Sequence, residues 1–432
     1  MKTFNFNVEK IAVIGLGYVG LPLSLLLARK YHVIGFDTDV AKIKKLKQGI
    51  NPITEPGVDS LISNQDIMNH IELSNNATDL KKARIKIITV GTPYDIPTDY
   101  IDYSQLESAI DLLKGNIKSG DLVVLKSTVP PGTTNTIIRE KIESYGFHVP
   151  DDVGIAFSPE RMVEGQAIND FKSLPKIIGA SDSETSKIVS EVIGSLGGDI
   201  ITVSKPETAE MVKLVDNYSR YVFLALTNEI ALMSERIGVD VLELLNAAKH
   251  NYPRNAGLMI PGPGVGGSCL NKDPFILKAY MKKKSLSLKL VNASSEVNKS
   301  IPVHIADLVI EFSGGRKNAV IAGVAFKGDT NDIRFTPTME IMDKLKLNNF
   351  KVRLSDPFTA IPGVEIEHDI YEASINKDIF ILLTDHTEYK SIDLKQLKSN
   401  MNKQPLIIDT RGLISREDAN SLGFEYHGYG RL

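Results

Sequence analysis

A thiol, an ammonium group and a carboxylate stand within five positions, at Cys269, Lys272 and Asp273. Cys269 is the only cysteine among 432 residues, and it follows the Gly/Pro-rich run 261–267 and Ser268. Such a run lets the backbone pass close to a ligand, because glycine has no side chain to obstruct it. Most free cysteines are buried and inert, so the competing interpretation is a glycine-rich turn followed by a packing residue. The rest of the chain favours a nucleophile.

A second glycine-rich segment, 15–20, predicts a dinucleotide-binding turn. It joins the apolar runs 10–14 and 21–28, and a further run, 32–36, ends at an acidic residue. This context gives a G-x-G-x-x-G match its weight against a glycine turn in some other α/β protein. The glycines let a pyrophosphate approach the helix N-terminus, while the acid would bond the ribose hydroxyls and repel a 2′-phosphate, which favours NAD over NADP. The expected cofactor-binding residues here are Gly15, Gly17, Tyr18, Val19, Gly20 and Asp37.

The same segment contains eighteen consecutive uncharged residues, 11–28, which a hydropathy window would read as a membrane span or a signal peptide. Three glycines and Pro22 interrupt it, and Glu9 precedes it where a signal peptide is basic. A buried strand, a turn and a buried helix fit better. Because a single cysteine also suits a reducing cytosol, we expect a cytoplasmic protein without a targeting segment.

The composition predicts two or three globular domains, because 432 residues exceed what one hydrophobic core usually holds. Hydrophobic residues make up 42% and charged residues 24% of the chain, which is ordinary for a globular protein. With 50 basic and 53 acidic residues the net charge is −3, so neither a nucleic-acid partner nor a membrane is expected. The eight histidines are scattered and none lies at ligand spacing from the cysteine, so we expect no catalytic metal.

Apolar runs alternate with helix-length segments up to residue 203 and predict a parallel sheet with helices on both faces. Three polar residues follow consecutive runs, namely Thr92, Thr128 and Glu160. At the carboxyl edge of the sheet they would line a crevice, although a threonine in such a position more often caps a helix. The predicted strands are 10–14, 32–36, 85–90, 122–128, 153–157, 176–179 and 200–203.

Residues 204–237 contain no glycine and a single proline, and they predict one helix of roughly 50 Å that ends at Gly238. A helix of this length exceeds the needs of one small domain. We therefore expect it to join two domains and to bury its surplus apolar face in a homodimer. Lys213 and Asn217 lie one turn apart on it and point to the same side, as two solvated residues could also do.

The alternation of strands and helices resumes toward the C-terminus and predicts a second doubly wound domain. Gly323 and Gly328 do not complete a G-x-G-x-x-G motif, so this domain lacks the full dinucleotide fingerprint. Lys327, Arg334 and Arg411 fall near strand ends, where an anionic ligand would bind. The predicted strands are 319–322, 351–354, 379–383 and 406–408.

The expected fold is therefore α/β, with two Rossmann-like doubly wound domains joined by a central helical domain that contains one long helix. The N-terminal NAD-binding domain is predicted to span 1–203. The helical domain with the cysteine loop should span 204–305, and the C-terminal domain 306–432.

With these residues the chain resembles the UDP-sugar 6-dehydrogenases, which oxidise the 6-hydroxymethyl group of a nucleotide sugar to a carboxylate. The resemblance extends from Gly15 to Arg411, and so many ordered matches are more specific than any single motif. It implies NAD as the cofactor and a UDP-sugar held by the C-terminal domain. The matching segments are 15–22, 127–133, 158–161, 164–165, 209–217, 266–270, 272–274, 326–329, 332–334 and 409–412.

Oxidation of an alcohol to an acid removes four electrons, which two NAD molecules must accept in succession. A thiolate that adds to the intermediate aldehyde forms a thiohemiacetal, whose oxidation leaves a thioester for water to cleave. This chemistry gives Cys269 a role, and Lys213 and Lys272 would balance the negative charge that develops. By resemblance, Lys213 and Asn217 stabilise the alkoxide and the tetrahedral oxyanions, while Asp273 positions or activates water.

The resemblance implies roles for further polar residues. Glu160 and Thr128 resemble the family's residues that assist proton transfer through water, and Thr92, Thr128 and Glu164 are expected to bind the cofactor. Arg254 is expected to reach the substrate of a neighbouring subunit. The substrate-binding residues that the resemblance implies are Glu160, Arg161, Lys213, Asn217, Arg254, Gly266, Lys272, Phe326, Lys327, Arg334 and Arg411.

Residues 252–254 and 261–267 are most similar to the family members that act on UDP-N-acetylhexosamines, so we expect UDP-N-acetylmannosamine first and UDP-N-acetylglucosamine next. Many of those members have histidine where this chain has Tyr252 and Ser268, and an apolar residue where it has Lys272. The lysine resembles the UDP-glucose branch, so a UDP-glucose 6-dehydrogenase is the alternative. A non-catalytic nucleotide-sugar sensor is a third interpretation, and the intact set of catalytic residue types argues against it.

Overall fold

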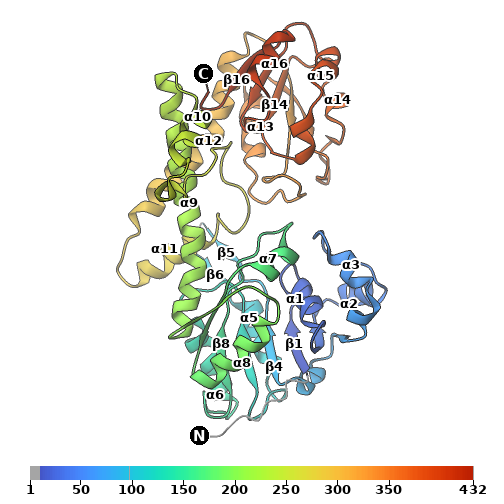
Figure 1. Ribbon diagram of the computed structural model, residues 1–432, viewed down its shortest axis with the longest axis vertical. Coiled ribbons are helices and arrows are strands. Elements are labelled where there is room, and N and C mark those ends of the chain that lie inside the picture. The colour runs from blue at the N-terminus through green and yellow to red at the C-terminus, as the bar shows by residue number, and fades with distance from the viewer. Residues whose placement is uncertain (1–9, 97, 432) are drawn as a thin grey trace. The chain divides into compact units, whose positions relative to one another are not determined.

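The structure is a computed structural model that describes residues 10–96 and 98–431 (Figure 1). Contacts between residues divide the chain into two compact units, 1–216 and 217–432. Each unit contains one large sheet of mainly parallel strands with helices around it.

The first unit follows the predicted alternation of strands and helices closely. One strand, β3, was not predicted, and a two-stranded hairpin, β5 with β6, was also missed. The strands are β1 (Lys10–Ile14), β2 (His32–Phe36), β3 (Ile71–Ser74), β4 (Ile85–Ile88), β5 (Tyr94–Asp95), β6 (Tyr100–Ile101), β7 (Leu122–Leu125), β8 (Gly154–Phe157), β9 (Lys176–Ala180) and β10 (Ile200–Val203). The helices are α1 (Gly20–Leu27), α2 (Val40–Lys47), α3 (Val58–Ile62), α4 (Gln65–Met68), α5 (Ser104–Asp111), α6 (Arg139–Ser144), α7 (Ala167–Ser173) and α8 (Ser183–Gly194), with η1 (Ala77–Lys82) and η2 (Thr134–Ile138) as single turns of 3₁₀ and π type.

The first sheet has the strand order β10-β9-β8-β7-β4-β1-β2-β3. The prediction of an all-parallel sheet was wrong at one place, because β8 and β9 pair antiparallel. The chain between them forms α7 and stays at the carboxyl edge, where the buried carboxylate of Glu55 accepts the N–H groups of Gly165 and Ala167 at 2.8 Å. It therefore enters β9 from the edge at which β8 ended, instead of crossing back over the sheet.

Both faces of this sheet are buried, as predicted. On β1, Ile11 and Val13 belong to one hydrophobic cluster together with α1 and α8, whereas Ala12 and Ile14 belong to another with α5 and α6. Successive side chains of a strand point to opposite faces, so a strand covered on both sides must be mainly apolar. This explains why the strands read as continuous apolar runs in the sequence.

The second unit consists of helices that follow α9 and of a second sheet. The long helix α9 (Pro206–Ile237) begins in the first unit and ends, as predicted, just before Gly238, whose φ is +71°. The other helices are α10 (Val241–Lys249), α11 (Asp273–Lys283), α12 (Lys289–Phe312), α13 (Pro337–Leu347), α14 (Ile370–Ala373), α15 (Leu394–Asn400) and α16 (Arg416–Ser421), with 3₁₀ turns η3 (Pro253–Asn255) and η4 (Thr387–Ser391). The strands are β11 (Asn318–Ala322), β12 (Lys351–Ser355), β13 (Ile366–Glu367), β14 (Ile379–Leu382), β15 (Leu406–Asp409) and β16 (Glu425–Gly428).

The second sheet is parallel throughout and has the order β13-β12-β11-β14-β15-β16. This order is the same as that of β3-β2-β1-β4-β7-β8 in the first unit, so the doubly wound arrangement occurs twice in the chain. Alternate residues of β11 face α12 and α13 on one side and α14 to α16 on the other. In such a fold a ligand binds at the carboxyl edge, between the first and fourth strands in sequence order, where the strand order reverses.

The predicted domain boundary at residue 305 falls within α12, which continues through Pro302 to Phe312.

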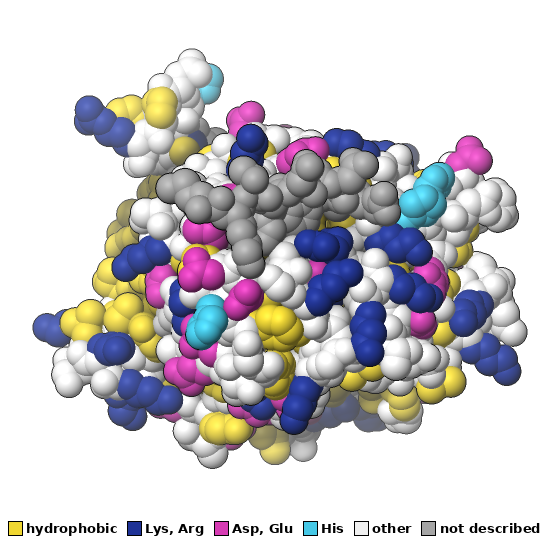
Figure 2. All heavy atoms as spheres, turned by 90° about the horizontal axis from the view of Figure 1, so that it is seen from below, with side chains coloured by type: hydrophobic (Ala, Val, Ile, Leu, Met, Phe, Trp, Pro, Cys, Tyr) yellow, Lys and Arg dark blue, Asp and Glu magenta, His cyan; other side chains and the backbone are white. Residues whose placement is uncertain are grey.

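Across residues 10–96 and 98–431, no helix combines the length and the apolar character needed to cross a membrane, and the uncharged stretch 11–28 forms β1, a turn and α1. Basic, acidic and apolar side chains are mixed on the face shown in Figure 2, as the balanced composition leads one to expect.

Candidate active site

The glycine turn of the first unit has the geometry of a phosphate-binding turn. Gly15 has a φ of +96°, and its N–H donates to the carbonyl of Phe36 at 2.8 Å. A Cβ on Gly20 would lie 1.8 Å from the carbonyl oxygen of Gly15, so only glycine allows this close turn. A Cβ on Gly17 would meet nothing within 4 Å. The open space at Gly17, at the N-terminus of α1, is what the pyrophosphate of NAD would need, so these residues fit the cofactor.

Asp37 lies where β2 ends and is already oriented by the protein. Its carboxylate accepts the N–H groups of Leu16 and Asp39 at 2.8 and 2.9 Å and pairs with Lys42 Nζ at 2.6 Å. Its side chain is 10% exposed. The carboxylate is therefore fixed beside the glycine turn, at the position expected for contact with a ribose. Tyr18 and Val19 are half-buried in the same turn.

The carboxyl ends of β4, β7 and β8 bring three predicted residues to neighbouring positions, because these strands are adjacent in the sheet. Thr92 Oγ1 donates to the carbonyl of Thr128 at 2.5 Å. Glu160 follows β8, and its carboxylate lies 3.3 Å from Lys126 Nζ. Lys126 is buried and also donates to the carbonyl of Ser158 at 3.1 Å. Glu160 is thus held by a buried cation.

Lys126 and Asp216 have contacts in this region that reasoning from the sequence missed. A lysine directly after the apolar run Leu122–Leu125 was the available sign of a buried charge that needs a partner. Arg161, expected to bind substrate, directs its Nε to Asp216 on α9 at 2.7 Å. Glu164, expected near the cofactor, is half-buried in the loop before α7.

Two predicted residues lie on α9, one helical turn apart. Lys213 is 9% and Asn217 3% exposed, so the alternative of two solvated residues was wrong. In the second unit, Asn217 Nδ2 donates to Asp273 Oδ2 at 2.6 Å, although the two residues are 56 positions apart.

Cys269 and Asp273 are joined by the turn that leads into α11. The carbonyl of Cys269 accepts the N–H of Asp273 at 2.9 Å, and Cys269 is exposed. Asp273 is 1% exposed, and among the described residues its Oδ1 accepts no hydrogen bond. Lys272 Nζ lies 3.9 Å from that oxygen. A buried carboxylate oxygen without a donor, one turn from a thiol, is suited to hold or deprotonate a water molecule.

The glycines before Cys269 have a different explanation from the one expected. A Cβ on Gly266 would lie 2.2 Å from the Phe326 side chain, and a Cβ on Gly262 would lie 2.6 Å from Arg411 Nη1. Gly267 donates its N–H to the carbonyl of Arg334 at 2.8 Å. The expectation that the glycines serve a ligand was therefore incomplete, because they let this loop pack against three predicted substrate-binding residues of the C-terminal domain.

Two predicted substrate-binding arginines of the second unit, Arg334 and Arg411, contact acidic side chains or a backbone carbonyl. Arg334 pairs with Asp332, with 2.6 Å between Nη2 and Oδ2. Arg411 Nε donates to the carbonyl of Leu383 at 2.9 Å, and its Nη2 lies 3.6 Å from Asp385 Oδ1. Burial lowers the pKa of the Arg411 guanidinium. The nearby carboxylates of Asp385 and of Asp409, at the end of β15, act in the opposite direction and raise that pKa.

Two predicted substrate-binding residues remain, Lys327 and Arg254. Lys327 is half-buried in the loop after β11, next to Phe326. Arg254 is exposed in η3, with its guanidinium 5.8 Å from the centroid of the Tyr252 ring. Within the part of the chain that the structure describes, no three His, Cys, Asp or Glu side chains form a group able to hold a metal ion.

Comparison with known proteins accounts for nearly the whole chain. It matches the profiles of three domains of the UDP-glucose/GDP-mannose dehydrogenase family: the NAD binding domain over residues 9–196, the central domain over 207–300 and the UDP binding domain over 320–416. UDP-N-acetyl-D-mannosamine dehydrogenase of Pyrococcus horikoshii is 33% identical over 430 residues, which are 98% of this chain and 99% of that protein.

A relative with a different sugar is almost as similar. UDP-glucose 6-dehydrogenase of Bacillus subtilis is 32% identical over 439 residues, which cover 98% of this chain and 93% of that protein. Among solved structures, the UDP-D-ManNAc dehydrogenase of Pyrococcus horikoshii matches with a TM-score of 0.87 at 31% identity, over 98% of this chain and 99% of that one.

Proposed function

Because the chain belongs to the UDP-glucose/GDP-mannose dehydrogenase family, we propose that it oxidises the C6 hydroxymethyl group of a UDP-N-acetylhexosamine to the carboxylate. It is an NAD-dependent UDP-sugar dehydrogenase, an oxidoreductase with an NAD-binding domain, a central helical domain and a UDP-binding domain. The proposal concerns the sugar, the full four-electron course and the residues that perform it.

NAD, when bound at the glycine turn 15–20 and Asp37, supplies the electron acceptor for both oxidations, and two molecules are needed per sugar. The chain's own contribution begins with Cys269, whose thiolate adds to the C6 carbon of the aldehyde and forms a thiohemiacetal. After the second oxidation C6 is a thioester on Cys269. Water then attacks the thioester, and the carbon–sulfur bond breaks to release the acid and regenerate the thiolate.

Each oxyanion along this course needs donors. We assign that role to Lys213 and Asn217, because an ammonium group and an amide N–H both stabilise developing negative charge. Glu160 and Thr128 would assist proton transfer through water at the first oxidation. Lys126, which holds Glu160, would keep its carboxylate in one orientation.

The observation that carries the proposal is the unsatisfied oxygen of Asp273. Its Oδ2 is bound by Asn217, while Oδ1 is buried without a donor among the described residues. A dehydrogenase that stopped at the aldehyde would have no use for a buried base one turn from a thiol. Hydrolysis of a thioester does need such a base, typically for about 10²–10⁴-fold in rate.

We place UDP-N-acetylmannosamine first as substrate, supported by the similarity to the Pyrococcus horikoshii enzyme. UDP-glucose is the second candidate, because the Bacillus subtilis relative is named for it and is nearly as similar. Lys327, Arg334 and Arg411 would hold the UDP moiety, and the guanidinium forks of the two arginines are suited to phosphate oxygens. We further propose a cytoplasmic homodimer that pairs through α9, in which Arg254 serves the neighbouring subunit's substrate.

The first experiment measures NADH released per UDP-sugar consumed, in parallel on UDP-N-acetylmannosamine, UDP-N-acetylglucosamine and UDP-glucose. Two NADH per sugar on one of the N-acetylated sugars, with slower turnover of UDP-glucose, is the expected result. One NADH per sugar would contradict the thioester course, and fastest turnover of UDP-glucose would contradict the choice of sugar.

Two variants separate the thiol from the base. Cys269→Ala should bind NAD and UDP-sugar as the wild type does but form no acid. Asp273→Asn should still form the thioester and hydrolyse it about 10²–10⁴-fold more slowly, so that an acyl adduct accumulates. Because Cys269 is the only cysteine, mass spectrometry of the intact chain can assign an acyl adduct to that residue, with Cys269→Ala as the negative control. Absence of any adduct in Asp273→Asn, with acid still formed at the wild-type rate, would overturn the assignment.

A further inference from the structure

The repeated strand order allows matching positions in the two sheets to be compared. Asp37 follows β2 and Asp356 follows β12, and these strands lie beside β1 and β11. In both sheets the acid accepts an N–H from the turn after the first strand, Leu16 to Asp37 and Val324 to Asp356, each at 2.8 Å. The second sheet thus has an acid where the first has its predicted ribose-binding acid.

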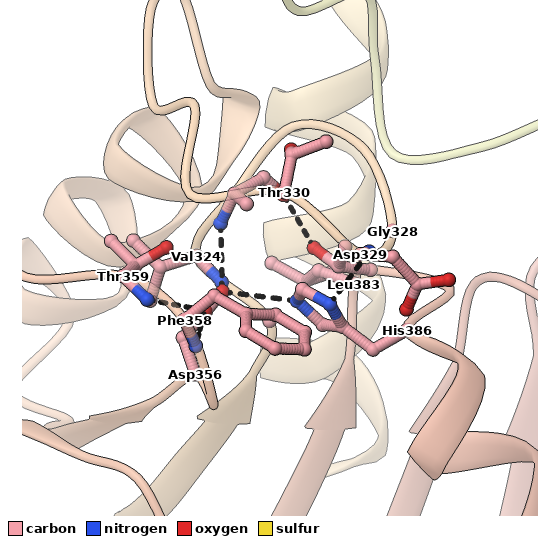
Figure 3. A network of polar contacts seen from close by, with 12 residues as sticks. Val324, Gly328, Asp329, Thr330, Asp356, Phe358, Thr359, Leu383 and His386 are labelled. Carbon is pink, nitrogen blue, oxygen red and sulfur yellow. Dashed lines mark hydrogen bonds and ion pairs between the residues drawn. The ribbon is translucent and has the colours of Figure 1, made fainter. Parts of the chain in front are cut away.

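Asp356, however, is fully enclosed. It has no solvent exposure, and its carboxylate also accepts from His386 Nε2 at 3.1 Å (Figure 3). Since the donors surround both oxygens, the carboxylate cannot turn toward a ligand and serves the protein's own structure. The backbone N–H donors are Val324, Ala325, Phe358 and Thr359, at 2.8 to 2.9 Å.

His386, also fully buried, connects this acid to a loop. Its Nδ1 lies 3.0 Å from the backbone nitrogen of Asp329, and that N–H can only donate. Nδ1 therefore accepts and carries no proton, so Nε2 carries the proton that bonds Asp356. The neutral imidazole thus joins the end of β12 to the loop after β11, as Figure 3 shows with Gly328, Asp329 and Thr330 above the ring.

The contacts of Asp329 stabilise an unfavourable backbone conformation. Its φ is +60°, which costs free energy in a residue other than glycine. The backbone N–H of Asp329 donates to His386, and its carboxylate accepts the N–H and the hydroxyl of Thr387 at 2.8 and 2.6 Å. The N–H of Gly328 bonds Asp385 Oδ1 at 3.2 Å. The segment after β14 thereby fixes a turn that the loop would not hold alone.

The loop 326–334 carries the groups that the proposed substrate needs. Lys327 precedes the turn and Arg334 ends the loop, where its carbonyl also accepts the N–H of Gly267. We propose that His386 is a positioning residue for nucleotide-sugar binding: as a neutral imidazole oriented by Asp356, it fixes the turn at Asp329 and so the placement of Lys327 and Arg334. This inference rests on the proposed function, because it takes these cations to meet the UDP moiety.

The competing role for His386 is apolar packing, since its ring lies 5.3 and 5.1 Å from the ring centroids of Phe358 and Tyr389. Two variants distinguish the roles. In His386→Asn the amide oxygen can accept the Asp329 N–H in place of Nδ1. In His386→Gln the amide nitrogen can donate to Asp356 in place of Nε2, but the acceptor for Asp329 is lost. His427→Asn, on β16, is a control outside the network.

The experiment measures the affinity of the full-length protein and its variants for UDP-N-acetylmannosamine by calorimetry, with NAD affinity as an internal reference. We expect His386→Gln to bind the UDP-sugar about tenfold more weakly, the effect of one lost buried hydrogen bond, and to bind NAD normally. His386→Asn should recover most of the affinity, and His427→Asn should match the wild type. Equal affinity of both His386 variants for the UDP-sugar would overturn the positioning role.

Hydrogen exchange at the Asp329 amide tests the same bond without any substrate. Exchange should be about tenfold faster in His386→Gln than in the wild type and near the wild-type rate in His386→Asn. Unchanged exchange in His386→Gln would contradict the inference even if the protein binds UDP-sugars. If the wild type binds no UDP-sugar at all, the proposed function fails, while the exchange rates still decide whether His386 holds the loop. A variant that does not fold is recognised by its melting temperature, and the other variant then decides.

Discussion

At the scale of single residues, surroundings decide what a carboxylate can do. Asp37, Asp273 and Asp356 are all mostly buried acids. Asp37 keeps some exposure and faces the glycine turn, Asp273 retains an oxygen without a donor among the described residues, and Asp356 is surrounded by donors. The same side chain is therefore suited to bind a ribose, to act on water, or to fix a turn. The sequence alone predicted a role for the first two and none for the third.

The charge of Asp37 should decide between NAD and NADP. Asp37→Ala is expected to weaken NAD binding and to raise NADP use relative to NAD by about tenfold, because repulsion of the 2′-phosphate disappears together with a charged hydrogen bond. Asp37→Asn, which keeps an acceptor for the Leu16 N–H, should shift the ratio in the same direction with less loss of stability. The ratio of kcat/KM values for the two cofactors is the measurement.

Asp39→Ala is the matched control for Asp37. Asp39 caps α2 by accepting the Lys42 N–H at 3.0 Å, so its loss should cost about 1 kcal/mol of stability without changing the cofactor ratio. A changed ratio in Asp39→Ala, or an unchanged one in Asp37→Ala, would argue against the role assigned to Asp37.

At the scale of helices and strands, the long apolar runs were predictable and the polar edge strands were not. Every run covered by helices on both faces was found in place, because such strands need apolar residues at most positions. The missed strands β3, β13 and β16 lie at the sheet edges and include charged residues such as Glu72, Glu367 and Glu425. An edge strand pairs on one side only, so its sequence is less constrained.

Gly17 and Gly20, two glycines of the turn 15–20, should respond differently to replacement by alanine. Gly20→Ala places a Cβ 1.8 Å from the Gly15 oxygen and should lower Tm by about 5 °C or more through the strain of that overlap. Gly17→Ala meets no atom within 4 Å, so it should fold normally but bind NAD at least about tenfold more weakly if the pyrophosphate passes there. Thermal melting and NAD titration are the two measurements. Normal NAD affinity in Gly17→Ala would mean that the cofactor does not approach this turn.

At the scale of the whole molecule, the helix α9 is longer than the core of one unit needs and leaves apolar side chains exposed. Across its length these are Val215, Phe223, Leu226, Met233 and Ile237. Side chains spaced by three, four and seven positions share one side of a helix, so several of these form a stripe. A stripe of this kind is usually covered by another protein surface.

A second copy of the chain is the proposed cover. Replacing Leu226 and Met233, which are 40% and 52% exposed, by glutamate should convert the dimer to a monomer, because charges would be buried in the interface. Leu347→Glu, at an 84% exposed position on α13, is the control and should leave the mass unchanged. Light scattering after size-exclusion chromatography gives the mass. A wild-type monomer, or a dimer that survives both substitutions, would refute pairing through α9.

The parts of the molecule that depend on local pattern were predictable from the order of amino acids. The glycine turn with its following acid, the two series of strands and helices, the long helix and the cysteine next to Asp273 all follow from residues close together in the chain. Their physical basis is the backbone freedom of glycine, the periodicity of buried strands and helices, and the chemistry of the side chains.

Contacts between residues far apart in the chain could be identified only in the folded molecule. Arg161 pairs with Asp216, Asn217 with Asp273, and His386 with Asp356, each across at least 30 positions. Such pairs depend on the order of strands in a sheet and on the direction in which each loop returns, which short-range pattern does not contain. The antiparallel entry of β9 has the same origin, because the buried acid Glu55 holds the loop before α7 at the carboxyl edge.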